Sequence, residues 1–236
     1  QLVIEKGKGI YLYDTKGKRY LDGISSLWVT VHSHHRKELN RAITKQLNKI
    51  AHTTLLGLAN LPSIELAEKL IKIAPPGLKK VFYSDNGSTA VEVALKIAFQ
   101  YQQLKGYKGK QSFLTLVNAY HGDTVGAVSV GGIDLFHKMY KPLLFKAFKA
   151  PSPHCFRCGD NDKCQLREPA AERRGSPPKA DEEPRLSVSG SELCLNQLEK
   201  IMKKHQAEIA AMIVEPMVQA AAGMLTMPRG YLKAVR

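Results

Sequence analysis

The chain has 236 residues, of which 44% are hydrophobic, and it carries a formal net charge of +14. This composition excludes a disordered chain, and no apolar run reaches the roughly 18 residues that a membrane span requires. The basic residues are spread along amphipathic segments, so they indicate a solvated surface rather than a nucleic-acid interface. The N-terminus lacks the apolar core of a signal peptide, and we expect a cytoplasmic protein that binds neither membrane nor nucleic acid.

The four cysteines do not form a disulfide framework in a chain of this size. Cys155 and Cys158, with Cys164 after them and His154 before them, resemble part of a zinc-binding motif. Zinc requires four ligands, and the next cysteine, Cys194, falls within a predicted helix. We therefore expect a reduced surface loop and no metal.

The first fifty residues predict part of a small N-terminal lobe. Residues 9–14 and 19–22 are two alternating runs around a polar turn, which predicts a β-hairpin. The next segment, 23–35, reads as a loop. Apolar residues at helical spacing then predict a helix over 37–50.

From residue 51 to residue 236 the pattern predicts the first part of a large α/β domain. Ser63 is expected to cap a helix that ends at Ala74 before two prolines. Strands then alternate with helices, and this order predicts a mostly parallel sheet with helices on both faces. The expected strands are 81–83, 112–117 and 209–214, the expected helices are 89–106 and 191–205, and 127–130 fits either a helix start or a strand.

The segment 165–190 interrupts this order. It is rich in proline and charged residues and poor in large apolar ones. Such a composition buries too little surface to offset the entropy of ordering it, so we expect a mobile surface loop.

The strongest site signal is the segment 83–92, where a predicted strand leads through a glycine-containing turn into a long helix. Backbone N–H groups at a helix start attract anions. Gly87 would let a phosphate approach closely, and the Ser88 hydroxyl would add a hydrogen bond. Thr89 and Glu92 have the spacing of a capping box. An ordinary capped helix without a ligand is the alternative.

Two further polar segments follow predicted strands. Tyr120, His121 and Asp123 come directly after the strand that ends at Val117, at a sheet edge where ligands bind in α/β proteins. These side chains suit a planar, polar cofactor, although Asp123 could simply cap the next helix. Glu215 follows the last strand, where it could orient a cofactor or substrate atom or serve as a structural charge. Motifs for dinucleotide binding, nucleotide hydrolysis and serine hydrolysis are missing from the sequence.

Three segments together resemble the class III aminotransferases, which have the pyridoxal-phosphate transferase fold type I. They are Asp22–Val29, Tyr120–Ala127 and Glu215–Gln219, and the similarity extends over nearly the whole chain. The run Ser25–Trp28 is most similar to family members that act in biotin synthesis. The resemblance implies that Gly87 and Ser88 hold the phosphate of pyridoxal 5'-phosphate, that Tyr120 stacks on its ring, and that His121 and Glu215 also contact the cofactor.

The same resemblance implies substrate contacts from Trp28, Leu27 and Asp123. The expected reaction converts 7-keto-8-aminopelargonate to 7,8-diaminopelargonate in a homodimer. Many members have two tryptophans where this chain has Leu27 and Trp28, so the amino donor stays open between S-adenosyl-L-methionine and lysine.

In the family, the lysine that links to the cofactor lies beyond the position of Arg236, so we expect no catalytic residue in this chain and no turnover by it alone. Measurable transamination by the isolated chain would refute this expectation.

Two alternative functions stay open. One is a class III aminotransferase for ornithine, acetylornithine or γ-aminobutyrate, which donor profiling would reveal. The other is a non-catalytic basic binding module, which stoichiometric zinc and salt-dependent nucleic-acid binding would reveal.

Overall fold

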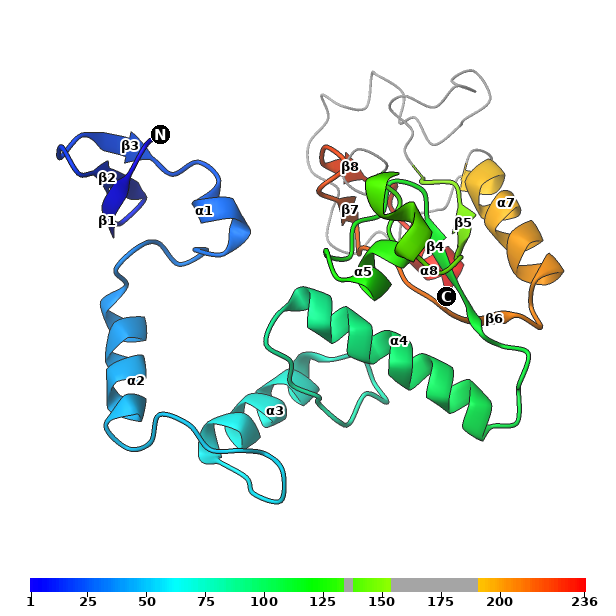
Figure 1. The fold of residues 1–236 in the computed structure, drawn as a ribbon, viewed down its shortest axis with the longest axis horizontal. Coiled ribbons are helices and arrows are strands. Elements are labelled where there is room, and N and C mark those ends of the chain that lie inside the picture. The colour runs from blue at the N-terminus through cyan, green and yellow to red at the C-terminus, as the bar shows by residue number, and fades with distance from the viewer. Residues whose placement is uncertain (134–137, 154–190) are drawn as a thin grey trace, which may run out of the picture. The chain divides into compact units, whose positions relative to one another are not determined.

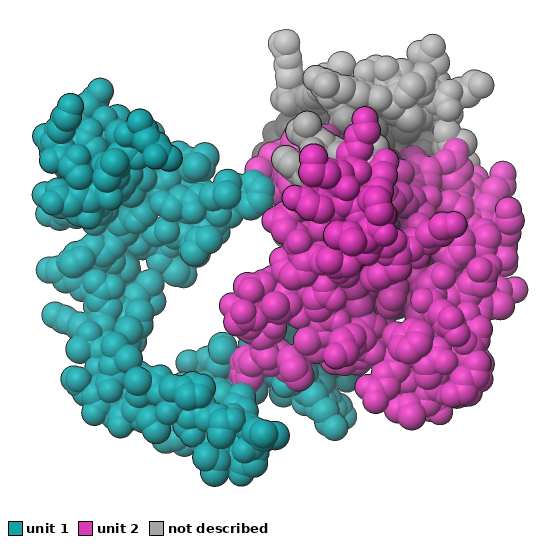
Figure 2. Space-filling view, viewed as in Figure 1, with its two compact units in different colours: residues 1–81 teal, residues 82–236 magenta. Residues whose placement is uncertain are grey.

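The computed structural model describes residues 1–133, 138–153 and 191–236. These residues form two compact units, Gln1–Val81 and Phe82–Arg236 (Figure 2). The division expected near residue 50 stays a prediction. The cysteine loop and the mobile loop expected at 165–190 lie outside the described residues.

The first unit begins with an antiparallel sheet of β1 (Ile4–Lys8), β2 (Tyr11–Asp14) and β3 (Arg19–Leu21), in that order. The predicted hairpin is β2 and β3, and it is confirmed, whereas β1 was not predicted. Asp14 is buried and closes the turn, because its carboxylate accepts hydrogen bonds from the Lys16 and Lys18 amides, both at 2.9 Å. The Tyr20 hydroxyl donates to the same carboxylate at 2.8 Å.

The predicted loop after the hairpin contains one turn of left-handed helix, α1 (Ser25–Trp28). All four residues have positive φ, with values of 48°, 43°, 60° and 72°. A left-handed helical conformation costs L-residues roughly 1–2 kcal/mol each. We call Ser25–Trp28 the left-handed turn; its surroundings must stabilise it.

Two right-handed helices complete the first unit, α2 (Lys37–Leu47) and α3 (Leu61–Ile73). Both were predicted, but the expected Ser63 cap of α3 is wrong. Asn60 caps this helix, because its side-chain oxygen accepts a hydrogen bond from the Ser63 amide at 3.0 Å. Pro62 lies in the first turn, where proline is well tolerated and where an upstream cap is expected.

The second unit is built on a three-stranded parallel sheet, with β4 (Ser112–Leu116) between β5 (Phe148–Ala150) and β6 (Ile209–Met212) (Figure 1). This confirms the predicted α/β class. The strand expected at 81–83 is wrong, since these residues have no strand conformation. Phe82 is 67% exposed, so this short run lacks the packing that stabilises a strand.

Helices cover both faces of this sheet, as predicted, because alternate residues of β4 point to opposite faces. Leu114 and Leu116 are fully buried in one cluster with Leu198 and Tyr231, which belong to α7 (Ser191–Lys204) and α8 (Tyr231–Val235). Phe113 packs in a second cluster. That cluster also contains Leu95 of α4 (Gly87–Leu104), Val130 and Ala210.

The remaining elements are shorter. Residues 127–130, which fitted either a helix or a strand, overlap the helix α5 (Val125–Ser129), whose last four residues are buried. A 3₁₀ helix, η1 (Lys138–Leu143), precedes β5. After β6, β7 (Val218–Gln219) pairs antiparallel with β8 (Leu225–Thr226). Over the described ranges, no helix is both long enough and apolar enough to cross a membrane.

Candidate functional site

The start of α4 carries the predicted anion-binding turn. Asn86 is its cap: its side-chain oxygen accepts a hydrogen bond from the Thr89 amide at 3.0 Å, and the Thr89 hydroxyl accepts one from the Asn86 amide at 3.3 Å. The amides of Gly87 and Ser88 precede the first intrahelical hydrogen bonds. A Cβ built on Gly87 would meet no atom within 4 Å. The start of this 18-residue helix is therefore open to an anion, which its dipole would attract.

Glu92 does not take part in the capping box that its spacing predicted. Its Oε1 atom accepts hydrogen bonds from the amides of Gly126 at 2.8 Å and Ala127 at 3.3 Å, in the first turn of α5. Those amides also precede the hydrogen bonds of their own helix, and a carboxylate is a better acceptor for them than water would be at a buried helix start. Glu92 thereby fixes α5 against α4. Sequence analysis missed this role.

The loop after β4 lies against the start of α4. The Asp123 amide donates a hydrogen bond to Ser88 Oγ at 3.3 Å, an interaction that we call the Ser88–Asp123 contact. Gly122 makes this approach possible: it has φ of +126°, and a Cβ built on it would lie 2.8 Å from Ser88 Cβ and 3.0 Å from Ser88 Cα. The structure thus brings Gly87, Ser88 and Asp123 together.

Tyr120 is fixed by two hydrogen bonds. Its hydroxyl donates to Asp123 Oδ2 at 2.7 Å, and its backbone amide donates to Glu215 Oε2 at 3.1 Å. The hydrogen bond to Asp123 raises the pKa of Tyr120 to about 12, with burial adding to the effect. The phenol is therefore protonated at neutral pH. Asp123 does not cap α5, because Thr124 occupies that position and no side chain caps it.

Glu215 connects the end of β6 to the end of β4. Besides the Tyr120 amide, its carboxylate accepts a hydrogen bond from the Ala220 amide at 3.2 Å. Burial raises the pKa of Glu215, and these two hydrogen bonds partly offset the rise. The structure therefore shows a carboxylate that holds two backbone segments at the carboxyl edge of the sheet.

Gln219, which sequence analysis did not single out, ties the same edge together. It is 1% exposed, and its amide nitrogen donates to the Val117 carbonyl at 2.9 Å. Its amide oxygen accepts a hydrogen bond from the Ser152 hydroxyl. Gln219 thus links the segments that follow β4 and β5. Its partners lie 102 and 67 positions away in the sequence, so no local pattern indicates this role.

His121 lies half-buried beside β4. Its Nε2 atom is 3.4 Å from the hydroxyl of Thr115, a fully buried residue of β4. Burial lowers the pKa of His121 to about 4, so the ring is neutral at pH 7. Its contact with a cofactor stays a prediction.

This lowered pKa predicts a pH-dependent stability. A group whose pKa is lower in the folded state stabilises the fold above its unfolded pKa of about 6.5 and loses that contribution as the pH falls toward about 4. We expect the unfolding free energy to fall by roughly 1–2 kcal/mol over this window, after allowance for partial exposure. His121→Gln should remove this loss in chemical denaturation between pH 4 and 8, whereas the same change at the exposed His52 should not. Parallel pH profiles for all three proteins would contradict the prediction.

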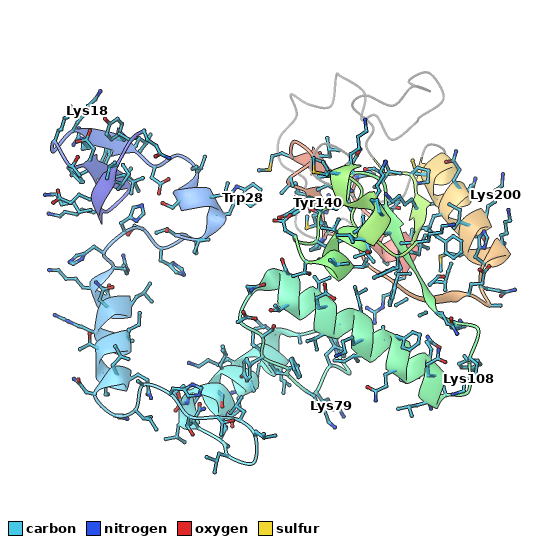
Figure 3. All side chains as sticks on the ribbon, in the orientation of Figure 1. Lys18, Trp28, Lys79, Lys108, Tyr140 and Lys200 are labelled. Carbon is cyan, nitrogen blue, oxygen red and sulfur yellow. The ribbon has the colours of Figure 1, made fainter. Side chains whose placement is uncertain are left out.

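Leu27 and Trp28 belong to the other compact unit. They are 62% and 50% exposed, and Figure 3 shows Trp28 projecting from α1. The contacts of these two side chains with a substrate stay a prediction.

A cavity of about 550 Å³ lies elsewhere on the second unit. Its lining includes Val128, Lys141, Phe145, Phe148 and Glu208, and the predicted site residues are not among its described lining. Within the described ranges, no group of three or more His, Cys, Asp or Glu side chains is arranged to hold a metal ion.

The family model for class III aminotransferases matches residues 1–236. Adenosylmethionine-8-amino-7-oxononanoate aminotransferases are similar to the chain: that of Anoxybacillus flavithermus is 52% identical over 234 residues, which are 99% of this chain and 46% of the relative. That of Geobacter sulfurreducens is 48% identical over 235 residues, 100% of this chain and 47% of the relative. The chain thus spans about half the length of the curated relatives that it matches.

The solved structures that are similar to this chain are also transaminases. The corresponding enzyme of Methanocaldococcus jannaschii superposes with a TM-score of 0.81 at 41% identity, over 100% of this chain and 45% of that chain. An amine transaminase of an uncultivated Pseudomonas species, solved in its PLP-bound form, gives a TM-score of 0.82 at 34% identity, over 100% of this chain and 49% of that chain. The fold is therefore that of the pyridoxal-phosphate transaminases, and the chain belongs to the class III aminotransferase family.

Proposed function

We propose that this chain forms the phosphate-binding and ring-binding part of a pyridoxal 5'-phosphate site in an aminotransferase. The Ser88–Asp123 contact carries the proposal, because it brings the open helix start and the tyrosine loop to one place. A cofactor that combines an anionic group with a planar ring requires both features within a few ångströms of each other.

The residues present fit the phosphate group. The amides of Gly87 and Ser88 point out of the helix start, and the space over Gly87 is open. Ser88 Oγ accepts a hydrogen bond from Asp123, which leaves its O–H able to donate to a phosphate oxygen. The helix start therefore offers two amides and one hydroxyl to an anion.

The ring would lie against Tyr120, whose phenol is held by Asp123 and whose backbone is held by Glu215. Because both restraints exist before a ligand arrives, little side-chain entropy is lost when the ring binds. His121 and Glu215 complete the proposed cofactor contacts. When bound, pyridoxal phosphate supplies an electron sink for transamination. The residues of this chain would bind and orient it. The resemblance implies that the lysine that links to the cofactor lies beyond the position of Arg236.

The proposed reaction is the conversion of 7-keto-8-aminopelargonate to 7,8-diaminopelargonate in biotin synthesis. It is supported by sequence identities of 48% and 52% to two relatives named adenosylmethionine-8-amino-7-oxononanoate aminotransferase. Trp28, Leu27 and Asp123 are the proposed substrate contacts, and S-adenosyl-L-methionine or lysine is the donor. A homodimer and a cytoplasmic location belong to the same proposal.

The test is an assay of the complete gene product with pyridoxal phosphate, 7-keto-8-aminopelargonate and each donor in turn. Formation of 7,8-diaminopelargonate with one of the two donors would support the proposal. Strong use of ornithine, acetylornithine or γ-aminobutyrate, without the biotin-pathway product, would replace it with another class III activity.

Tyr120 provides a test of the cofactor contact itself. Tyr120→Ala should raise the dissociation constant of pyridoxal phosphate by about tenfold, because ring stacking contributes roughly 1–1.5 kcal/mol beyond the area buried. Tyr120→Phe keeps the ring and should change the constant by less than about threefold. Titration of the cofactor by fluorescence or absorbance measures both. Equal losses in the two variants would point to the hydroxyl and contradict the stacking role.

A further inference from the structure

The left-handed turn, Ser25–Trp28, is the most unusual backbone feature of the first unit. Its four consecutive residues all have positive φ, and none is glycine. Ser26 and Leu27 have φ/ψ of 43°/52° and 60°/60°, which are the angles of a left-handed helix. Non-glycine residues remain in this conformation only where the surrounding structure fixes them. The contacts around the turn must therefore stabilise this backbone conformation.

Asp22 stabilises the turn through two hydrogen bonds. One carboxylate oxygen accepts a hydrogen bond from the Ser26 amide at 2.8 Å, and the other accepts one from the Ser26 hydroxyl at 2.8 Å. The Asp22 side chain is only 3% exposed. Both bonds reach the second residue of the turn, where the left-handed conformation must be maintained.

His34 fixes the position of the Asp22 carboxylate. Its Nε2 atom lies 2.7 Å from Asp22 Oδ2, so this nitrogen carries the proton and donates to the carboxylate. Its backbone forms a two-way bridge with Gly9, at 2.8 Å and 3.2 Å. Its ring packs on Gly7 of β1, where an added Cβ would lie 2.6 Å from His34 Cγ. His34 therefore connects the turn to the sheet of the first unit.

This support lies on the inner side, while the end of the turn presents two large apolar side chains to the outside. Leu27 is 62% exposed and Trp28 is 50% exposed, whereas the His34 side chain is 16% exposed. Exposed apolar side chains on a fixed backbone can bind an apolar ligand with a smaller loss of entropy than mobile ones. The Asp22 and His34 side chains are therefore much less accessible than those of Leu27 and Trp28.

We propose that Asp22 and His34 are positioning residues, which hold the left-handed turn so that Leu27 and Trp28 are displayed at a fixed place to the aliphatic chain of the substrate. The link to substrate rests on the proposed function, whereas the holding of the turn does not. Asp22 and His34 touch no reacting atom in this proposal. They act through the geometry of the turn.

The holding of the turn is tested without substrate. Trp28 is the only tryptophan of this chain, so its fluorescence reports on the turn. The complete gene product is compared with its Trp28→Phe variant to subtract any other emission. We expect His34→Gln and Asp22→Asn to shift the emission of Trp28 and to increase its quenching by acrylamide about twofold, because the left-handed turn relaxes. His32→Gln, a change at an exposed histidine of the same loop, should do neither.

A rescue variant separates strain from general damage. Ser25→Gly removes the steric cost of positive φ at a residue whose side chain is not needed by Asp22. In the His34→Gln background it should restore at least about half of the lost fluorescence signal. Failure of this rescue would overturn the proposal. If His34→Gln does not fold, Ser26→Ala removes a single hydrogen bond to Asp22 and should cause a smaller shift in the same direction.

The link to substrate is tested by steady-state kinetics of the same variants. We expect His34→Gln to raise KM for 7-keto-8-aminopelargonate about tenfold with kcat changed less than about twofold, since an interaction lost equally in ground and transition states raises KM alone. Unchanged fluorescence in both the Asp22 and His34 variants would overturn the holding of the turn. Altered fluorescence with unchanged KM would overturn the role toward substrate. If the parent protein does not use this substrate, the proposed function fails and the fluorescence result still stands.

Discussion

Replacing Gly122 by alanine is expected to lower the free energy of unfolding by about 3 kcal/mol and to weaken pyridoxal phosphate binding more than about tenfold. Two physical effects add. Alanine is strained at φ of +126°, and its Cβ would overlap Ser88, whose backbone Cα would be only 3.0 Å away. Because a backbone atom cannot move aside as a flexible side chain can, the loop must retreat and the Ser88–Asp123 contact must break.

Gly57→Ala is the matched control. Gly57 also has positive φ, at +79°, but a Cβ built there would meet no atom within 4 Å. It therefore measures the conformational strain alone, which we expect to cost about 1 kcal/mol with no effect on the cofactor. Chemical denaturation and cofactor titration of the complete gene product would measure both variants. If Gly122→Ala and Gly57→Ala lost the same stability and bound the cofactor equally well, close packing of the loop on Ser88 would contribute neither to stability nor to cofactor binding.

Replacing Glu92 by alanine is expected to cost about 2–3 kcal/mol of stability, because the amides of Gly126 and Ala127 lose a charged acceptor. Gly126 and Ala127 are buried, so water cannot readily replace the carboxylate. Glu92→Gln keeps one acceptor oxygen and should lose about half as much. Since α5 directly follows the tyrosine loop, the alanine variant should also weaken cofactor binding.

Glu199→Ala is the control for loss of a helical glutamate. Glu199 is 58% exposed and pairs with Lys203 on the surface of α7, so its removal should cost less than about 0.5 kcal/mol. Thermal and chemical denaturation of the three variants would rank them. Equal stabilities of Glu92→Ala and Glu199→Ala would mean that the two amides find other acceptors, and that Glu92 does not fix α5.

Strands and turns with local signals were predicted well where one interpretation dominated. The buried strand expected at 112–117 and the polar turn between β2 and β3 were both confirmed. The caps of α3 and α4 were misplaced because several polar residues compete at each helix start. At α3, Asn60 and Ser63 are both good caps, and the position of Pro62 in the first turn decides for Asn60.

The strand expected at 81–83 failed for a different reason. A short apolar run has the same appearance in a strand as in an extended connection, and only a hydrogen-bonding neighbour distinguishes them. The left-handed turn could not be predicted at all from local preference, since Ser25, Ser26, Leu27 and Trp28 each disfavour positive φ. Asp22 and His34 stabilise it from elsewhere in the loop.

The sequence by itself determined the α/β class, the glycine-containing turn that opens α4 and the resemblance to class III aminotransferases, because those signals lie within a few consecutive residues. Only the tertiary structure decided which partner each carboxylate takes. Glu92 pairs with amides 34 and 35 positions away, and Glu215 pairs with an amide 95 positions away. A carboxylate accepts hydrogen bonds from whichever donors the fold brings within about 3 Å, and sequence spacing carries no information about such distant neighbours.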